Sequence, residues 1–338
     1  MKRNYIIDDI KVLFAIAIAC SHYTGSVFES YIVVDCFFIL SGYFLISNYE
    51  SQKFADAYAY TKNRIKKLYG KYILAFVILF VWKNLRLFTN GIEWLKEIAK
   101  SLPEIFLLQN TGIFPGGINY PLWQLCTLII ASHILYSLLE KDKKMTINVF
   151  CPILIICVYT CLSNLYGNQE IDIWGVEYHF FYIPIFRAFA AISIGMVIYR
   201  PINEAANYIN KLHEWKYNLL SLTVIGSFWL NRNTYIGLIS FALVLMFSLC
   251  PKGLFKCLNK KTPISGERLS LWLYLNHAFI IDILQTYNIK LIGNDASWIH
   301  KGCFIVILIS YSILTNQFFE WTKILWKKYQ KTQIKVNV

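Results

Sequence analysis

The chain has 338 residues, of which 57% are hydrophobic and 16% are charged, and its formal net charge is +13. Soluble domains are usually nearer half apolar, and apolar runs recur along this whole chain, so the composition excludes a large soluble domain. The positive charge does not indicate nucleic-acid binding, because the basic residues gather in alternate loops, as they do in membrane proteins.

The apolar runs, taken in chain order, predict an all-α, polytopic integral membrane protein with about ten transmembrane helices. The expected spans are residues 9–27, 31–49, 70–88, 120–139, 146–166, 178–199, 217–231, 234–250, 269–288 and 301–322. With the N-terminus placed in the cytoplasm, the inner segments hold 23 of the 33 lysines and arginines, and the outer segments hold six. This asymmetry predicts a multi-pass protein of the inner (cytoplasmic) membrane with both termini cytoplasmic.

Three segments outside the expected spans are longer than turns, within what we interpret as a single membrane domain over residues 1–338. Residues 50–69 are basic and aromatic, and we expect them to form an amphipathic segment on the cytoplasmic leaflet. Residues 89–119 predict a surface helix followed by a Gly/Pro-rich loop on the outer side, and residues 323–338 predict a basic cytoplasmic tail. The nine cysteines lie mostly in apolar runs without a CxxC spacing, which favours packing residues over a disulfide framework or a metal site.

Ionisable residues in the first two spans indicate a functional site, because hydrocarbon disfavours them. Lys11 and His22 are eleven residues apart, close to three helical turns, so they share one face at a separation of about 16 Å along the axis. A basic anchor at one depth and a proton acceptor at another suit a ligand that lies along the helix with an anionic end and a reacting end. Asp35, at a depth similar to that of His22, can orient His22 or pair with Lys11 or another basic group.

Several segments resemble the acyltransferase 3 family of integral membrane acyltransferases. The resemblance begins with a basic residue, ten intervening residues and a histidine in the first span, here Lys11 and His22. It continues with VDCFFILSGYFL at residues 34–45 and the basic NRIKKLYGKY at residues 63–72. Weaker similarities are PLWQL at 121–125, SLWLYLNH at 270–277 and FFEW at 318–321.

The chain departs from the family pattern at two positions. Lys11 stands where arginine is common, and lysine cannot form a planar bidentate contact with phosphate. Gly70 stands where proline is common, at the start of the third span. The chain resembles the short form of the family, without an attached hydrolase-like domain.

The resemblance implies transfer of an acetyl group from acetyl-CoA, as co-substrate, to a hydroxyl of a cell-surface glycan or lipid-linked sugar. His22 is the expected general base, or the acyl carrier of an acyl-histidine route, since imidazole titrates near neutral pH. Lys11, Arg64 and Lys67 are expected to bind the phosphates of coenzyme A from the cytoplasm. Such a basic cluster also serves as an anchor to anionic membrane lipids, and that alternative stays open.

Further polar residues inside the expected spans are candidates for the substrate path. His277 lies within the SLWLYLNH similarity, and Arg187 lies near the middle of its span, where an unpaired charge is costly. Aromatic residues of the outer side are candidates to stack on sugar rings: Trp94, Tyr120, Trp123 and Trp174. The alternative interpretation of the chain is a transporter or flippase without covalent chemistry, although no inverted repeat is visible in the sequence.

Overall fold

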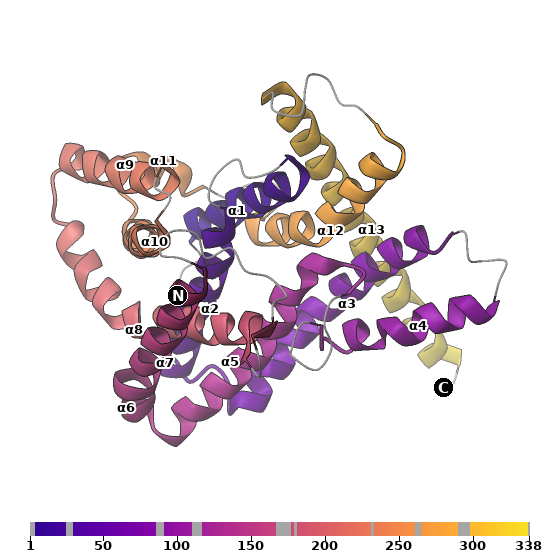
Figure 1. Cartoon of the computed structure of the whole chain (residues 1–338), viewed down its shortest axis with the longest axis horizontal. Helices are drawn as coiled ribbons and strands as arrows, with labels where there is room; N and C mark the ends of the chain where they lie inside the picture. The colour runs from indigo at the N-terminus through magenta and orange to yellow at the C-terminus, as the bar shows by residue number, and fades with distance from the viewer. Residues whose placement is uncertain are drawn as a thin grey trace.

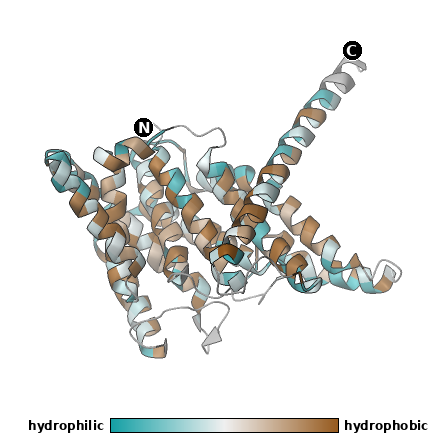
Figure 2. Ribbon diagram, turned by 90° about the horizontal axis from the view of Figure 1, so that it is seen from above, coloured by the Kyte–Doolittle hydropathy of each residue, from teal (hydrophilic) through white to brown (hydrophobic). Residues whose placement is uncertain are grey.

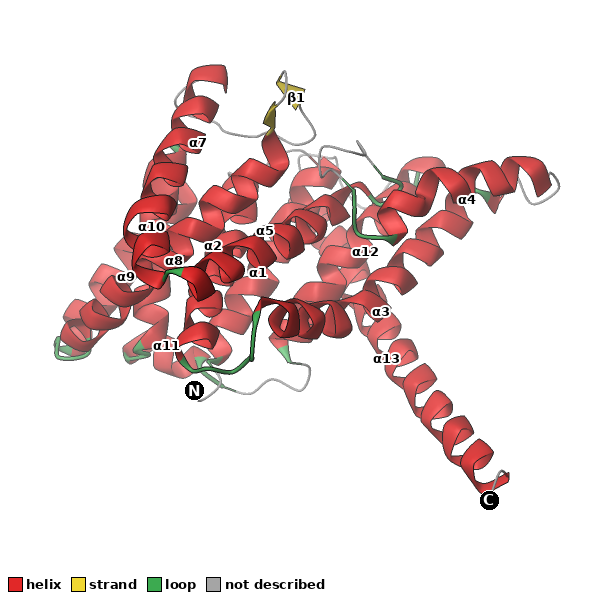
Figure 3. Cartoon of the chain, turned by 90° about the horizontal axis from the view of Figure 1, so that it is seen from below, coloured by secondary structure: helices red, strands yellow, loops and turns green. Residues whose placement is uncertain are grey.

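The structure is a computed structural model that describes residues 4–24, 30–85, 91–109, 117–166, 177–178, 181–230, 233–260, 265–289 and 298–336. The described residues are almost entirely helical, as Figure 3 shows. The helices are α1 (Tyr5–Thr24), α2 (Ser30–Glu50), α3 (Ala57–Lys83), α4 (Gly91–Ile105), α5 (Trp123–Lys141), α6 (Lys143–Met145), α7 (Cys151–Tyr166), α8 (Ile183–Ile209), α9 (Glu214–Leu230), α10 (Thr234–Leu249), α11 (Gly253–Leu258), α12 (Gly266–Thr286) and α13 (Trp298–Val336). A 3-10 turn, η2 (Tyr120–Leu122), precedes α5, a π-helical turn, η3 (Thr146–Phe150), precedes α7, and strands β1 (Glu177–Tyr178) and β2 (Phe181–Tyr182) form a short antiparallel hairpin.

The prediction of a helical membrane protein is confirmed, and each expected span overlaps one helix among α1, α2, α3, α5, α7, α8, α9, α10, α12 and α13, although several bounds differ. Five segments among the described residues are long and apolar enough to cross a membrane: Tyr31–Glu50, Tyr120–Lys141, Lys143–Leu165, Ile183–Ile209 and Trp298–Gln330. Thr234–Leu249 is a shorter apolar helix. The count of about ten transmembrane helices therefore stays a prediction.

The connections on either side of α3 show how the basic segment and the outer loop are built. Asp56 caps α3 by accepting a hydrogen bond from the backbone N–H of Ala59, and the helix then runs without interruption to Lys83. Most of the segment 50–69 is therefore the first half of α3. The surface helix expected within residues 89–119 is α4, and residues 110–116 of that loop, like Trp174, lie outside the described residues.

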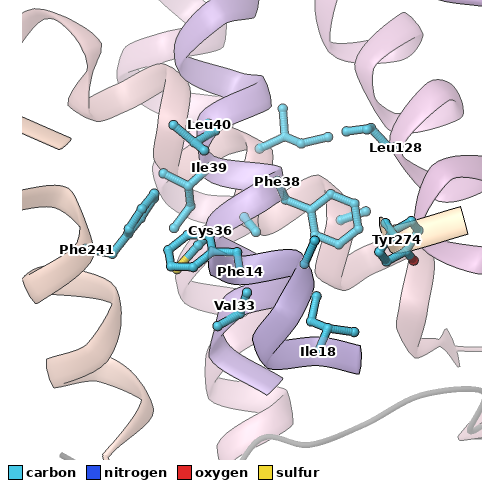
Figure 4. Packing of buried hydrophobic residues seen from close by; sticks show 14 of the residues in the cluster. Phe14, Ile18, Val33, Cys36, Phe38, Ile39, Leu40, Leu128, Phe241 and Tyr274 are labelled. Carbon is cyan, nitrogen blue, oxygen red and sulfur yellow. The ribbon is translucent and has the colours of Figure 1, made fainter. Parts of the chain in front are cut away.

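Helices α2 and α8, both labelled in Figure 1, cross in close contact at the centre of the bundle. A Cβ atom at Gly42 would overlap the carbonyl of Ile192, and one at Gly195 would overlap the carbonyl of Ile39. Small residues let membrane helices approach this closely, because backbone then packs against backbone. The buried side chains around this crossing include Val33, Cys36 and Ile39 of α2 (Figure 4).

Helix α1 packs along α12, although about 250 residues separate them in the chain (Figure 1). Phe14 of α1 reaches the aromatic cluster of the neighbouring helices, where its ring lies 5.6 Å from Phe241 of α10 and 5.8 Å from Phe37 of α2. Figure 4 shows Phe14 on the side of α1 that faces Phe241, and Ile18 on the other side. The first helix is thus held from two sides.

Hydrophobic residues run along most helices, as the brown colour in Figure 2 shows, and many of them are exposed on the outside of the bundle. Large side chains such as Ile156 of α7, Ile239 of α10 and Val306 of α13 are each more than 60% exposed. A soluble protein rarely exposes apolar patches of this extent, so this surface is suited to lipid. The C-terminal part of α13 extends beyond the bundle, and both termini lie on the side opposite the β1–β2 hairpin (Figure 3).

The α2–α8 crossing can be tested with Gly195→Ala. The added methyl group meets backbone atoms that cannot move independently, so we expect a loss of about 1–3 kcal/mol in the free energy of unfolding, measured in detergent. Gly226→Ala in α9 is the matched control, because a Cβ there meets no described atom within 4 Å. If both variants unfold at the temperature of the unmodified protein, the close crossing is wrong.

Candidate active site

His22, the expected catalytic residue, lies in the last turn of α1, where its side chain is exposed. Its ring stacks on that of His277 of α12, with 5.3 Å between centroids and 14° between planes. The ring of Tyr120 meets His22 edge-on at 5.2 Å. The structure thus brings together two histidines and a tyrosine that come from three distant parts of the chain.

His277 is completely buried, and its protonation is set by its neighbour in the same helix. Its Nδ1 atom lies 2.7 Å from the carbonyl oxygen of Tyr274. Because a carbonyl only accepts hydrogen bonds, Nδ1 carries the hydrogen and Nε2 presents a lone pair. The ring stacked on His22 is therefore a hydrogen-bond acceptor.

The segment that carries Tyr120 is held by a buried carboxylate of α4. The backbone N–H groups of Ile118 and Asn119 donate to the Glu104 carboxylate at 2.6 and 3.0 Å. Burial raises the pKa of Glu104 to about 7. On the other side, the Asn119 amide donates to the carbonyl of Leu275, and the hydroxyl of Tyr274 donates to the carbonyl of Pro121. This network fixes Tyr120 against α12.

The three residues expected to bind coenzyme A line one cavity at the other end of α1. This cavity, called here the basic pocket, has a volume of about 230 Å³ and lies between α1, α2 and the start of α3. Its lining consists of Lys11, Phe37, Leu40, Ser41, Phe44, Asn48, Lys53, Phe54, Tyr60, Asn63, Arg64 and Lys67. Four cationic side chains thus meet four aromatic rings and two amides.

The cations of the basic pocket differ in how firmly they are held. Arg64 donates to the hydroxyl of Tyr60 at 2.6 Å and to that of Ser132 at 3.2 Å. The Lys11 ammonium lies 5.4 Å from the centre of the Phe44 ring and 3.8 Å from the Asp8 carboxylate. Lys67 is exposed. The pocket therefore offers a guanidinium oriented by two hydrogen bonds, beside ammonium groups that include the exposed Lys67.

Asp35 and Arg187 form a buried ion pair between α2 and α8. The guanidinium donates to both carboxylate oxygens, at 2.8 and 3.2 Å, and to the carbonyl of Tyr31 at 2.7 Å. Both side chains are at most 2% exposed. The sequence allowed Asp35 either to orient His22 or to pair with a basic group. The structure shows it paired with Arg187.

The expected site residues converge at two places along α1. Lys11 belongs to the basic pocket, and His22 belongs to the histidine pair. The remaining pair, Asp35 and Arg187, lies within the packed core. Among the described residues, no group of three or more His, Cys, Asp or Glu side chains is placed to hold a metal ion.

Sequence reasoning missed the supports of the site, namely Glu104, Gln109 and Asn119. Glu104 is a carboxylate on an otherwise amphipathic surface helix, and only its burial, with 2% exposure, distinguishes it from the partly exposed Glu93 and Glu97 nearby. The signal that was available is the position of Asn119 two residues before the PLWQL similarity.

Comparison with known proteins gives one match. The family model for the acyltransferase domain of the acyltransferase 3 family matches residues 4–315, nearly the whole chain. The chain belongs to the acyltransferase 3 family. No match was found among the curated proteins or among the solved structures. The family member described here carries its first signature residues on one helix, Lys11 in the first half of α1 and His22 in its last turn.

The Asp35–Arg187 pair can be tested by removing one charge at a time. Asp35→Leu or Arg187→Leu leaves the other charge buried alone, and we expect each to lower the free energy of unfolding by about 3–5 kcal/mol. The double variant removes both charges, so we expect it to be more stable than either single variant. Thermal unfolding in detergent measures this, and strictly additive losses would contradict the pairing.

Proposed function

We propose that this membrane acyltransferase transfers an acetyl group from acetyl-CoA to a hydroxyl of a cell-surface polysaccharide or glycolipid, such as a capsule, O-antigen or exopolysaccharide unit. Family membership establishes acyl transfer as its class of reaction. The donor, the acceptor and the role of His22 are our proposals. The observation that carries them is the convergence of Lys11, Arg64 and Lys67 on one pocket, at the opposite end of α1 from His22.

The chemistry of the basic pocket suits the phosphate end of coenzyme A. Arginine and lysine bind phosphate through charge-assisted hydrogen bonds, and the aromatic rings of Phe44 and Tyr60 offer faces for a purine. Pockets that enclose a whole small-molecule ligand usually have about 300–1,000 Å³. A pocket of about 230 Å³ therefore suits one part of the donor, with its acyl arm extending away.

The length of α1 suits the remainder of the donor. Eleven residues of helix separate Lys11 from His22, which corresponds to about 16 Å. The acyl-pantetheine arm of acetyl-CoA is an extended chain that leads from the phosphates to the thioester. With its phosphates at Lys11, this arm runs along α1 and presents the thioester near His22.

The proposed reaction uses His22 as the base. His22 takes the proton of the acceptor hydroxyl while the hydroxyl oxygen bonds to the thioester carbon and the carbon–sulfur bond breaks. The proton then passes to the coenzyme A thiolate, so an ester and a free thiol result. The acyl-histidine route, in which His22 first takes the acetyl group, uses the same residues.

The proposed setting is the inner membrane, with about ten spans and both termini in the cytoplasm, where acetyl-CoA is made. The basic pocket then faces the cytoplasm, and the histidine pair lies toward the outer side, where Tyr120 and the α4 loop meet the acceptor. The transporter alternative has no support beyond the number of helices, because the family match indicates group transfer.

The function is tested by NMR of the purified surface glycan from cells with the unmodified protein, no protein or His22→Ala, at matched membrane levels. We expect O-acetyl signals that disappear with His22→Ala, since the exposed imidazole is then lost. Acetylation that persists with His22→Ala would refute the role of His22. Loss of the surface glycan itself on deletion, rather than of its acetyl groups, would favour transport.

The donor site is tested with two exposed lysines of α3. Lys67 lines the basic pocket, whereas Lys62 lines a separate groove beside α5. We expect Lys67→Gln to raise the KM for acetyl-CoA about tenfold, because the substitution removes one hydrogen bond between charged groups. Lys62→Gln should leave this KM unchanged, and equal effects of the two substitutions would indicate nonspecific attraction by surface charge.

A further inference from the structure

Three buried hydrogen-bond acceptors near the histidine pair have no partner among the described residues. They are His277 Nε2, Asn119 Oδ1 and Gln109 Oε1. All three residues are completely buried, with 0% exposure. Folded proteins rarely leave a buried polar atom unpaired, because such an atom loses its hydrogen bonds to water, so these three acceptors are candidates to bind a ligand.

The chemical identity of these atoms follows from their neighbours. His277 donates through Nδ1 to the Tyr274 carbonyl, and Asn119 donates through Nδ2 to the Leu275 carbonyl at 3.3 Å. Because a carbonyl oxygen can only accept, each N–H group must face it, and the remaining atom of each side chain must be the acceptor. An exchanged amide orientation would place two oxygens against each other.

Gln109 follows the same rule and joins the set to the segment before α5. Its Nε2 atom donates to the carbonyls of Asn119 and Tyr120, at 3.3 Å each, which leaves Oε1 as the acceptor. Gln109 and Asn119 are therefore parts of one bonded network. Tyr120, which continues that network, has its ring 6.5 Å from the ring of His277.

The set lies beside the proposed reaction centre. His277 stacks on His22 at 5.3 Å, and Tyr120 meets His22 at 5.2 Å. His22 is exposed and Tyr120 is half-buried, so these two residues lie between the buried set and the surface. The Glu104 carboxylate, bonded to the Asn119 backbone, adds a further acceptor group and no cation.

We propose that His277, Asn119 and Gln109 form the subsite that binds the acyl acceptor, and that this subsite recognises an uncharged polyhydroxylated group by its hydroxyl donors. The inference rests on the proposed function and adds the residues and the chemistry of acceptor recognition. Each unpaired atom accepts one hydroxyl hydrogen. A carboxylate or phosphate group offers no donor to these atoms and is repelled by their partial negative charge.

His277 is a binding residue in this scheme, and its stacking on His22 brings one bound hydroxyl close to the base. The basic pocket at the other end of α1 would hold the anionic donor, whereas this subsite would hold the neutral acceptor. The two ligands would thus be distinguished by charge.

The test compares His277→Phe, His277→Gln and the control His133→Phe in the full-length protein in membranes. Phenylalanine keeps a ring to stack on His22 and removes the acceptor atom, whereas glutamine keeps both an N–H donor and an acceptor oxygen. His133 lies ten residues into α5, about 15 Å along that helix, and bonds Thr61 of α3. The acceptor is the surface glycan of the same cells, freed of its esters by mild base.

We expect His277→Phe to raise the apparent KM for this glycan about tenfold, with a smaller change in kcat at saturating glycan, as the loss of one hydrogen bond predicts. His277→Gln should restore most of the affinity, and His133→Phe should match the unmodified protein. In detergent, the glycan should raise the unfolding temperature of the unmodified protein and of His277→Gln more than that of His277→Phe.

Equal losses with His277→Phe and His277→Gln, or a KM for His277→Phe within about twofold of the unmodified value, would overturn the subsite. NMR of the product would overturn its chemistry if the acetylated sugar carried a carboxylate or phosphate. If the unmodified protein neither transfers acetyl nor consumes acetyl-CoA, the proposed function itself fails, and that outcome is distinct from the others.

Discussion

The buried ion pair between Asp35 and Arg187 fixes the centre of this protein. A single buried charge in an apolar helix bundle is strongly unfavourable. Each of these side chains therefore needs the other close enough for the guanidinium to donate to both carboxylate oxygens. The pair lies near the crossing of α2 and α8, where Gly42 and Gly195 already place backbone against backbone. Charge and shape thus specify the same helix arrangement.

The position of α2 in turn shapes the basic pocket. Phe37, Leu40, Ser41 and Phe44 of α2 form one wall of that pocket, and Lys11 and Arg64 enter from α1 and α3. The ion pair is therefore connected with the proposed donor site through packing, without contributing a group to it. Helix α1 links this pocket to the histidine pair, so one helix sets the distance between Lys11 in the pocket and the proposed base, His22.

The sequence predicted the features that depend on local pattern. Apolar runs predicted a helix at every expected span, and helical spacing predicted α4 within the outer loop. The clustering of Lys11, Arg64 and Lys67 followed from charge and from the family resemblance. The span count does not follow as directly, because several of these helices are short or carry too many charges for length and composition alone to decide.

Pairings between distant helices were not predictable from the same patterns. Nothing in the period of either helix shows that Asp35 meets Arg187, or that His22 stacks on His277. The unpaired acceptor of Asn119 is even harder to predict, because it depends on which atom of the amide bonds to the carbonyl of Leu275 in α12. Such features arise from tertiary contacts, which one sequence without relatives does not encode in readable form.

The contact of α1 with α12 also has a consequence for the order in which the protein is made. At the start of α12, a Cβ atom on Gly266 would lie 2.9 Å from the backbone of Asp8 in α1. The first helix is synthesised long before α12, so Asp8 and Lys11 remain without this packing partner during most of translation. A ribosome that stops before α12 leaves a chain with the proposed base but without the imidazole on which it stacks. Completion of the active site therefore coincides with completion of nearly the whole chain.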